Sequence, residues 1–429
     1  MKKVLLTLLA VFMAVPAFSI EVYNNGDNSV AIYGHIRGYL GYGMGHKPNV
    51  DVTGPGISTP TGEDKKNHNF LYGLQDNTRI GTNIKIGNFS GQIELGANEK
   101  TMYKETTKDT VGFRQAWGAY TFGNGSKLLF GKTDTPTAMG GFNSDIYQTD
   151  GGLNGFGGTA TGSRRFQIQY SIAGLTLALI EDDMKDGMSM DGFTDNAPYT
   201  PRAGISYTFK NDNLLVKLAA TYTAVNGSYH KTGDTTGKLS WTNLHAGGVT
   251  LGVKPQFGNM WVGFVARYGV NEDLYGEAKT LAFNQTGYGH NGYQLSIPGV
   301  KNKPFDRTFN AEDGSFNNTH RAGAAIEFGM KATENFTAIL GAGYQATIQE
   351  MKEIVDIYLF QVHSPSYLVH SYAVFLQGQY AFSPNFALVP QIAWYGTVGK
   401  ASGTIGTNKY EVSDSQNGLL VGAQFRVTF

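Results

Sequence analysis

The residue types that usually carry out catalysis do not form a recognisable active site in this sequence. The 429 residues include no cysteine, which excludes thiol catalysis, disulfides and cysteine-ligated metals. The nine histidines show no pair at metal-ligand spacing on a helix, and no nucleophile elbow singles out a serine for a catalytic triad. We therefore expect no enzyme, no metal and no cofactor. A hydrolase built on a β-barrel is the open alternative.

One acidic segment carries the oxygen ligands that divalent cations prefer. Residues 181–187 contain four carboxylates, and Asp191 and Asp195 follow. The run lacks the one-residue ligand spacing of a calcium loop. We therefore expect a solvated external loop rather than a cation site.

The remaining candidate chemistry is electrostatic and depends on which face of a strand each arginine occupies. Residues 165–172 alternate strictly, and such alternation separates the two faces of a strand. Arg165 lies on the polar face of this segment. Arg79 and Arg114 fall on the polar faces of their own segments, and Arg37 on the first predicted strand is a fourth candidate.

Similar alternation recurs along the whole chain and predicts sixteen strands. Most exceed the ~5–6 residues usual in soluble sheets and are long enough to cross a bilayer at a tilt. Seven short turns and eight long loops join them, which is typical of an antiparallel transmembrane β-barrel rather than a soluble sandwich. The predicted strands are 29–43, 75–87, 88–98, 110–122, 126–133, 163–172, 174–182, 201–210, 213–225, 241–254, 259–271, 319–331, 334–349, 367–382, 385–398 and 417–429.

Composition supports export and a membrane barrel. The chain has 57 glycines, 13% aromatic residues and only 16% charged residues, and 34 basic side chains balance 34 acidic ones, which argues against a nucleic-acid partner. Met1, Lys2 and Lys3 followed by an apolar run over 4–15 predict a signal peptide, with cleavage after Ser19. We expect residues 20–429 to form a single barrel domain, with the long connections including 44–74, 134–162 and 272–318.

The sequence resembles the trimeric general porins of Gram-negative outer membranes. The resemblance covers the strand rhythm of the whole mature chain, and its specific motifs lie in residues 77–81, 113–120, 129–132 and 164–171, and at the terminal Phe429. It implies a sixteen-stranded antiparallel barrel with a loop folded inward after the fifth strand, here 134–162. It also implies a homotrimer in the outer membrane, surrounded by lipid and lipopolysaccharide and recognised through Phe429 by the assembly machinery.

The same resemblance implies a pore constriction with opposed charges. Its basic side would be Arg37, Arg79, Arg114 and Arg165, and its acidic side Asp145 and Asp150, with Asp134 at the base of the loop. The family's loop often carries Pro-Glu-Phe-Gly-Gly, whereas residues 137–141 keep only the glycine pair. The acid that faces the pore is therefore left open at this point.

The expected function is passive diffusion of ions and small hydrophilic solutes through a water-filled channel. The alternative is a barrel that serves mainly as a surface adhesin or antigen scaffold, with the loop 272–318 as its working part. On the strands, Glu94 and Glu327 are the clear acids with inward parity, and Arg202, Arg267, Arg321 and Arg426 share that parity as wall charge. This basic surplus favours a mild preference for anions, whereas the three loop aspartates favour cations, so the ion selectivity is left open at this point.

Overall fold

The computed structural model is built of β-strands. None of the residues that it describes forms a helix long and apolar enough to cross a membrane. The structure describes residues 19–47, 50–54, 57–61, 65–75, 78–97, 111–144, 153, 155–158, 164–181, 193–195, 201–233, 235–236, 238–272, 309–310, 314–316, 318–350, 354–357, 360–363, 366–405 and 408–429. Residues 1–18 of the predicted signal peptide and most of the loop 272–318 therefore lie outside the described residues.

The strands follow one another along the chain as antiparallel hairpins. Their bounds are β1 Ile20–Asn24, β2 Asn28–Lys47, β3 Val50–Gly54, β4 Ile57–Thr61, β5 Lys65–Leu74, β6 Arg79–Ile86, β7 Phe89–Ala97, β8 Val111–Thr121, β9 Lys127–Asp134, β10 Arg164–Ile172, β11 Leu175–Ile180, β12 Phe193–Asp195, β13 Arg202–Lys210, β14 Leu214–His230, β15 Leu239–Phe257, β16 Met260–Val270, β17 Phe309–Asn310, β18 Ser315–Phe316, β19 Thr319–Lys331, β20 Phe336–Glu350, β21 Ile354–Ile357, β22 Phe360–His363, β23 Ser366–Ser383, β24 Phe386–Ile405 and β25 Asn408–Thr428.

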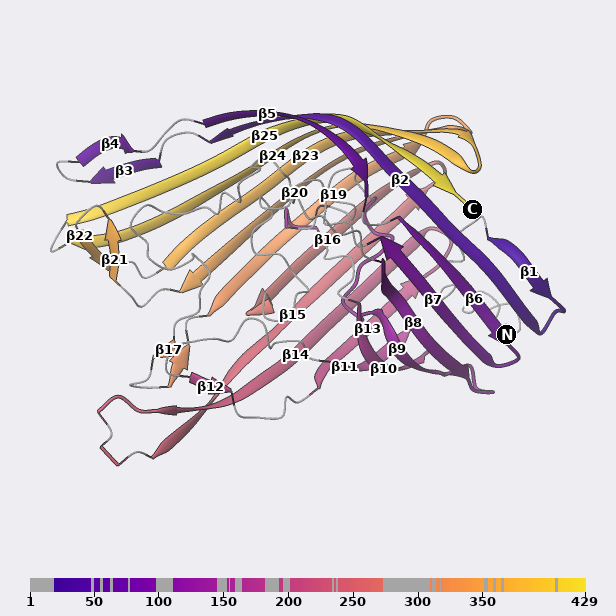
Figure 1. Cartoon of the computed structure of the whole chain (residues 1–429), viewed down its shortest axis with the longest axis horizontal. Coiled ribbons are helices and arrows are strands. Elements are labelled where there is room, and N and C mark those ends of the chain that lie inside the picture. The colour runs from indigo at the N-terminus through magenta and orange to yellow at the C-terminus, as the bar shows by residue number, and fades with distance from the viewer. Residues whose placement is uncertain are drawn as a thin grey trace.

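The wall closes between the first long strand and the last. Residues 35–46 of β2 pair with residues 417–428 of β25, and Gly34 and Phe429 exchange backbone hydrogen bonds of 2.7 and 3.0 Å. β5 and β6 together occupy one position in the wall. β6 pairs with the first half of β2, and β5 pairs with the second half. The result is a closed antiparallel barrel of 16 strands, as predicted (Figure 1).

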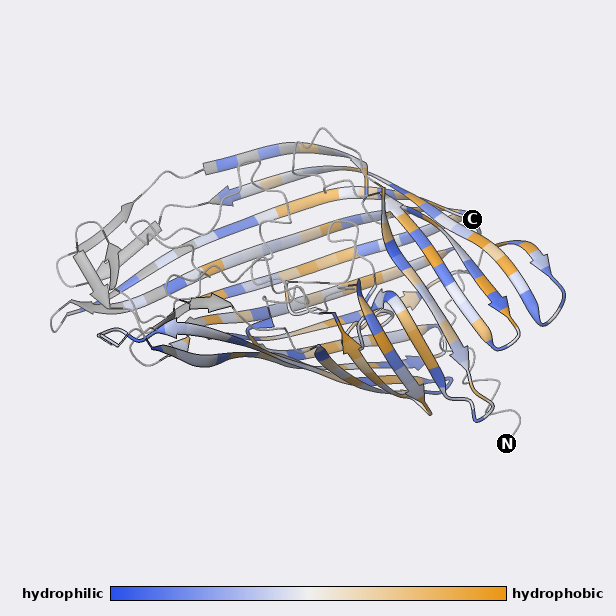
Figure 2. Ribbon diagram, turned by 60° about the horizontal axis from the view of Figure 1, so that its bottom comes forward, coloured by the Kyte–Doolittle hydropathy of each residue, from blue (hydrophilic) through white to orange (hydrophobic). Residues whose placement is uncertain are grey.

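The two faces of the wall differ in polarity, and exposure shows which face is outside. On β10, Phe166 and Ile168 are 51% and 47% exposed, whereas Gln167 is fully buried. The same alternation follows the other strands and appears as orange and blue segments in Figure 2. Apolar side chains therefore point away from the barrel and polar ones line its inside. This is the arrangement of a barrel whose outer surface contacts lipid.

All seven predicted short turns are present, at one end of the barrel (Figure 1, right). One of the two-residue turns joins β10 to β11 through Ala173 and Gly174, whose φ angles are +48° and +86°. Positive φ at both central residues matches the right-handed twist of a two-residue hairpin, and glycine adopts it without steric cost.

The structure corrects the predicted boundaries at the other end. The predicted loop 44–74 contains β3, β4 and β5, and the predicted strand 75–87 begins only at Arg79. β14, β15, β24 and β25 continue into the predicted loops 226–240 and 399–416, and β21 and β22 lie in the predicted loop 350–366. Strands that leave the lipid have no apolar face, so their sequence loses its alternation while their hydrogen-bond ladder continues.

Candidate functional site

A buried carboxylate joins two of the four predicted basic residues. Glu94 on β7 is 1% exposed, and its Oε1 accepts a 2.9 Å hydrogen bond from Arg114 Nε on β8. Arg79 Nε on β6 lies 3.3 Å from Glu94 Oε2, and the Tyr33 hydroxyl on β2 donates to the same oxygen at 2.8 Å. We call Tyr33, Arg79, Glu94 and Arg114 the Glu94 cluster. Two guanidinium groups share one carboxylate, so the cluster keeps a net positive charge.

Neighbouring side chains hold the Glu94 cluster in place. Gln92 Nε2 donates to the Tyr33 hydroxyl at 2.5 Å, and Trp117 Nε1 donates to Gln92 Oε1 at 2.8 Å. Gly96 leaves the space that the stem of Arg114 fills, because a Cβ at this position would collide with the Arg114 side chain. Hydrogen-bonded neighbours of this kind fix the rotamers of the charged groups.

Arg37 lies beside this cluster on the inner face of β2. Every second residue of β2 lies on that face, namely Tyr33, His35 and Arg37. His35 lies opposite Arg79 in the β2–β6 pairing. The Arg37 backbone holds the junction of β5 and β6: its carbonyl accepts from Gln75 N at 2.8 Å, and its N–H donates to Thr78 Oγ1 at 3.1 Å. The structure thus brings Arg37, Arg79 and Arg114 to one sector of the wall.

The other predicted residues are arranged differently. Asp134 pairs with Arg164 Nε at 3.3 Å across β9 and β10, rather than with an arginine of the Glu94 cluster. Arg165 shares the inner face of β10 with Gln167 and is half-buried. Asp145 and Asp150 lie outside the described residues.

The segment after β9 turns into the barrel and lies against its inner wall. Met139 and Phe142 are buried with Ala219 of β14 and Val265 of β16. Lys217 Nζ donates to the Ala138 carbonyl at 2.7 Å, and Lys254 Nζ donates to the Gly141 carbonyl at 2.8 Å. We call the described residues 135–144, 153 and 155–158 the lumen segment.

Glu327 of β19 binds Ser144, the last residue of the stretch 135–144 of the lumen segment. Its carboxylate accepts from Ser144 N at 2.7 Å and Ser144 Oγ at 3.0 Å, and from Trp261 Nε1 at 3.0 Å. Glu327 is buried, so these three donors satisfy a carboxylate that would be costly to bury without partners.

A second apolar contact lies further along the lumen segment. Leu153 and Phe156 are buried in a cluster with inward residues of β19 to β25, among them Phe375 and Leu420. The Phe156 and Tyr395 rings lie 5.1 Å apart between centroids. The lumen segment therefore packs against the wall from β14 to β25, and its second cluster includes Tyr39 of β2, whereas the Glu94 cluster lies on β2, β6, β7 and β8.

Comparison with known proteins supports the fold. No family model and no curated protein matches the chain. The outer membrane channel DcaP of Acinetobacter baumannii aligns at a TM-score of 0.53 and 15% identity, over 95% of this chain and 99% of that one. The chain has the fold of an outer-membrane channel. The anion-selective porin of Comamonas acidovorans aligns over 94% of this chain and all of that one, at a TM-score of 0.47 and 14% identity, which is too distant to add to this assignment.

Sequence reasoning missed a second charged cluster of this channel fold. Glu272 follows β16, and its carboxylate bonds Arg267 Nη2 at 2.9 Å and Arg321 Nη2 of β19. Burial alone would raise the pKa of Glu272, but the two guanidinium groups outweigh burial and hold that pKa below its usual value. Gly248 and Gly269 leave room for the carboxylate. The sequence did place Arg267 and Arg321 on the inner face of the barrel. Because two neighbouring buried cations require an anion, this placement could have predicted an acidic partner.

Proposed function

We propose that this protein forms a water-filled channel in the outer membrane of Gram-negative bacteria, through which ions and small hydrophilic solutes diffuse down their gradients. The observation that carries the proposal is a closed barrel of 16 strands with a polar, charged inner wall. Arg79 and Arg114 keep 26% and 18% of their side-chain surface exposed although they point inward, so space for water reaches the inner wall. A barrel of this strand number is too wide for its own side chains to fill.

We propose that residues 134–162 narrow this channel. The lumen segment packs inside the barrel against β14 to β25 and near Tyr39 of β2, and Arg37, Arg79 and Arg114 lie on the inner face of β2, β6 and β8. A basic surface across a narrow aqueous gap raises the local concentration of anions and orients dipolar solutes. We therefore infer a mild preference for anions.

We propose a homotrimer as the functional form. The support is the sequence resemblance to trimeric porins. Chemical cross-linking of the protein in outer-membrane vesicles, followed by denaturing electrophoresis, should give a ladder that ends at three copies. Recovery of the monomer alone would contradict the trimer but would leave the channel proposal unchanged.

Swelling of liposomes tests passive diffusion directly. Proteoliposomes that contain the mature protein should swell in isotonic sugar solutions, quickly with a monosaccharide and more slowly as sugar size increases. Protein-free liposomes are the control. A folded barrel that gives no swelling with any sugar would contradict the proposal.

A further inference from the structure

Among the residues that the structure describes, four tyrosine–histidine pairs repeat on the outer face of the barrel. Each tyrosine lies on a strand that runs toward the loop end, and each histidine lies on the next wall strand, opposite the residue two places beyond the tyrosine. The hydroxyl of Tyr222 lies 2.7 Å from Nδ1 of His245, and that of Tyr268 lies 3.0 Å from Nδ1 of His320. Tyr344 bonds His370 in the same way, and the rings of Tyr42 and His68 stack at 6.2 Å.

These pairs mark the edge of the apolar band toward the loops. On the outer face of β15, Leu251 and Val249 lie on one side of His245, and Asn243 and Trp241 lie on the loop side, with Trp241 57% exposed. Histidine, tyrosine and tryptophan favour this level because each has an apolar ring and a polar atom that reaches the headgroups.

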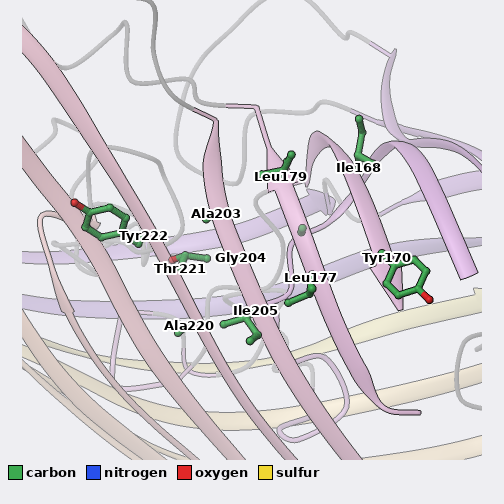
Figure 3. Close-up of a pocket in the computed structure, with 11 residues that line it drawn as sticks. Ile168, Tyr170, Leu177, Leu179, Ala203, Gly204, Ile205, Ala220, Thr221 and Tyr222 are labelled. Carbon is green, nitrogen blue, oxygen red and sulfur yellow. The ribbon is translucent and has the colours of Figure 1, made fainter. Parts of the chain in front are cut away.

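One pair borders an apolar groove on the outer wall. The groove has a volume of about 490 Å³ and runs across β10, β11, β13 and β14. Figure 3 shows Tyr222 at one end and Tyr170 at the other, with the small residues Ala203, Gly204 and Ala220 between them. Larger leucine and isoleucine side chains also line it: Ile168, Leu177, Leu179 and Ile205.

The chemistry of the two ends suggests one kind of occupant. The groove lies within the apolar surface of the barrel, where the neighbouring molecules are acyl chains. At its Tyr222 end, Nδ1 of His245 is engaged by the tyrosine hydroxyl. When the phenol donates to Nδ1, the neutral imidazole keeps its proton on Nε2, and the charged imidazole also carries a proton there. Nε2 then presents an N–H donor at the level of the headgroups.

We propose that the groove and His245 together bind a phosphorylated lipid of the leaflet that surrounds the loop ends. An acyl chain lies over Ala203 and Ala220, and a phosphate oxygen accepts a hydrogen bond from His245 Nε2. Glu181 is exposed at the loop end of β11, two strands away from β14, and its carboxylate repels phosphate. This repulsion favours a position of the headgroup at the His245 end of the groove. The proposal rests on the membrane location but not on conduction.

Native mass spectrometry of the detergent-purified protein tests this site with two probes, dipalmitoyl phosphatidic acid and the matching diacylglycerol. Ala203→Leu fills the groove and should reduce retention of both probes several-fold. His245→Ala should reduce retention of phosphatidic acid by about ten- to a hundredfold, the range of one charge-assisted hydrogen bond, and should leave diacylglycerol unchanged.

Matched variants separate the site from general surface effects. Ala322→Leu and His320→Ala make the same changes on the outer face of β19, outside the residues that line the groove, and should retain phosphatidic acid as the unchanged protein does. Ala220→Val is the milder groove variant if Ala203→Leu does not fold. Equal phosphatidic acid retention by the groove variants and the unchanged protein would overturn the proposal. So would loss of self-association in Ala203→Leu, because the groove would then be a contact between copies of the chain.

Discussion

Ser144 and Glu327 lie 183 positions apart in the sequence and are joined by two hydrogen bonds, of 2.7 Å from the Ser144 backbone N–H and 3.0 Å from its hydroxyl. The first residue belongs to the lumen segment and the second to the inner face of β19. This contact therefore helps to hold the segment against the wall, together with the bonds from Lys217 and Lys254.

Glu327→Gln should loosen this attachment. The amide has one acceptor oxygen and no charge, so two charge-assisted hydrogen bonds of about 1.5–3 kcal/mol each weaken or vanish. We expect a broader distribution of single-channel conductance with a higher mean. Glu334→Gln, which makes the same change in the exposed turn after β19, is the control. Identical conductance distributions for the two variants would contradict a role for Glu327 in holding the segment.

Arg114→Glu should shift ion selectivity toward cations. The substitution reverses one charge of the Glu94 cluster and places a second carboxylate near Glu94. Arg114→Gln removes the charge more gently and should give a smaller shift in the same direction. The measurement is the reversal potential under a salt gradient, with Lys210→Glu near a short turn as the matched control. An unchanged reversal potential in both Arg114 variants would exclude this residue from the selectivity of the pore.

Glu272 should make stability depend on acid pH. Its pKa in the folded protein is lowered, so its ion pairs stabilise the fold fully above the ordinary carboxyl pKa of about 4.3 and are lost as pH falls through the folded value. We expect Glu272→Gln to be less stable than the unchanged protein at pH 7. The difference between their unfolding midpoints in guanidinium chloride should shrink below about pH 4. A difference that stays constant from pH 7 to pH 3 would show that the ion pairs contribute nothing.

Gly263→Ala should displace the first stretch of the lumen segment. A Cβ at this position would collide with the backbone carbonyl of Phe142, which has no flexible end to move aside. We expect a lower unfolding midpoint and an altered conductance. Gly112→Ala is the control, because a Cβ there meets no atom within 4 Å. Equal behaviour of the two variants would show that close packing at Gly263 is not needed.

Much of the fold could be predicted because lipid imposes a two-residue period. Every membrane-crossing strand was found from this alternation, and all seven short turns were located between strands. The alternation stops where the lipid stops, so the extension of β14 to His230 and the strand β5 were missed. In residues 65–74 the alternation is interrupted by Leu71, which is apolar between Phe70 and Tyr72, so no strand was predicted there.

For the candidate site, the sequence predicted which side chains face the inside of the barrel but not which of them bind one another. Parity placed Arg79, Arg114 and Glu94 inside the barrel, yet the sharing of one carboxylate depends on the register of β6, β7 and β8. The wall contacts of the lumen segment left a different signal. Val265, Phe375 and Leu420 are apolar residues at inward positions, where polar ones are expected, and all three are buried under or near that segment. Apolar residues of inward parity thus mark where an inward-folded segment attaches.

Recording from a planar bilayer tests the central claim most directly. The refolded mature protein, added under a salt gradient, should produce stepwise and lasting increases in conductance, with a reversal potential whose sign indicates anion preference. The folded state is checked by the shift in electrophoretic mobility on heating. Folded protein that inserts into the bilayer but never conducts would contradict a water-filled channel.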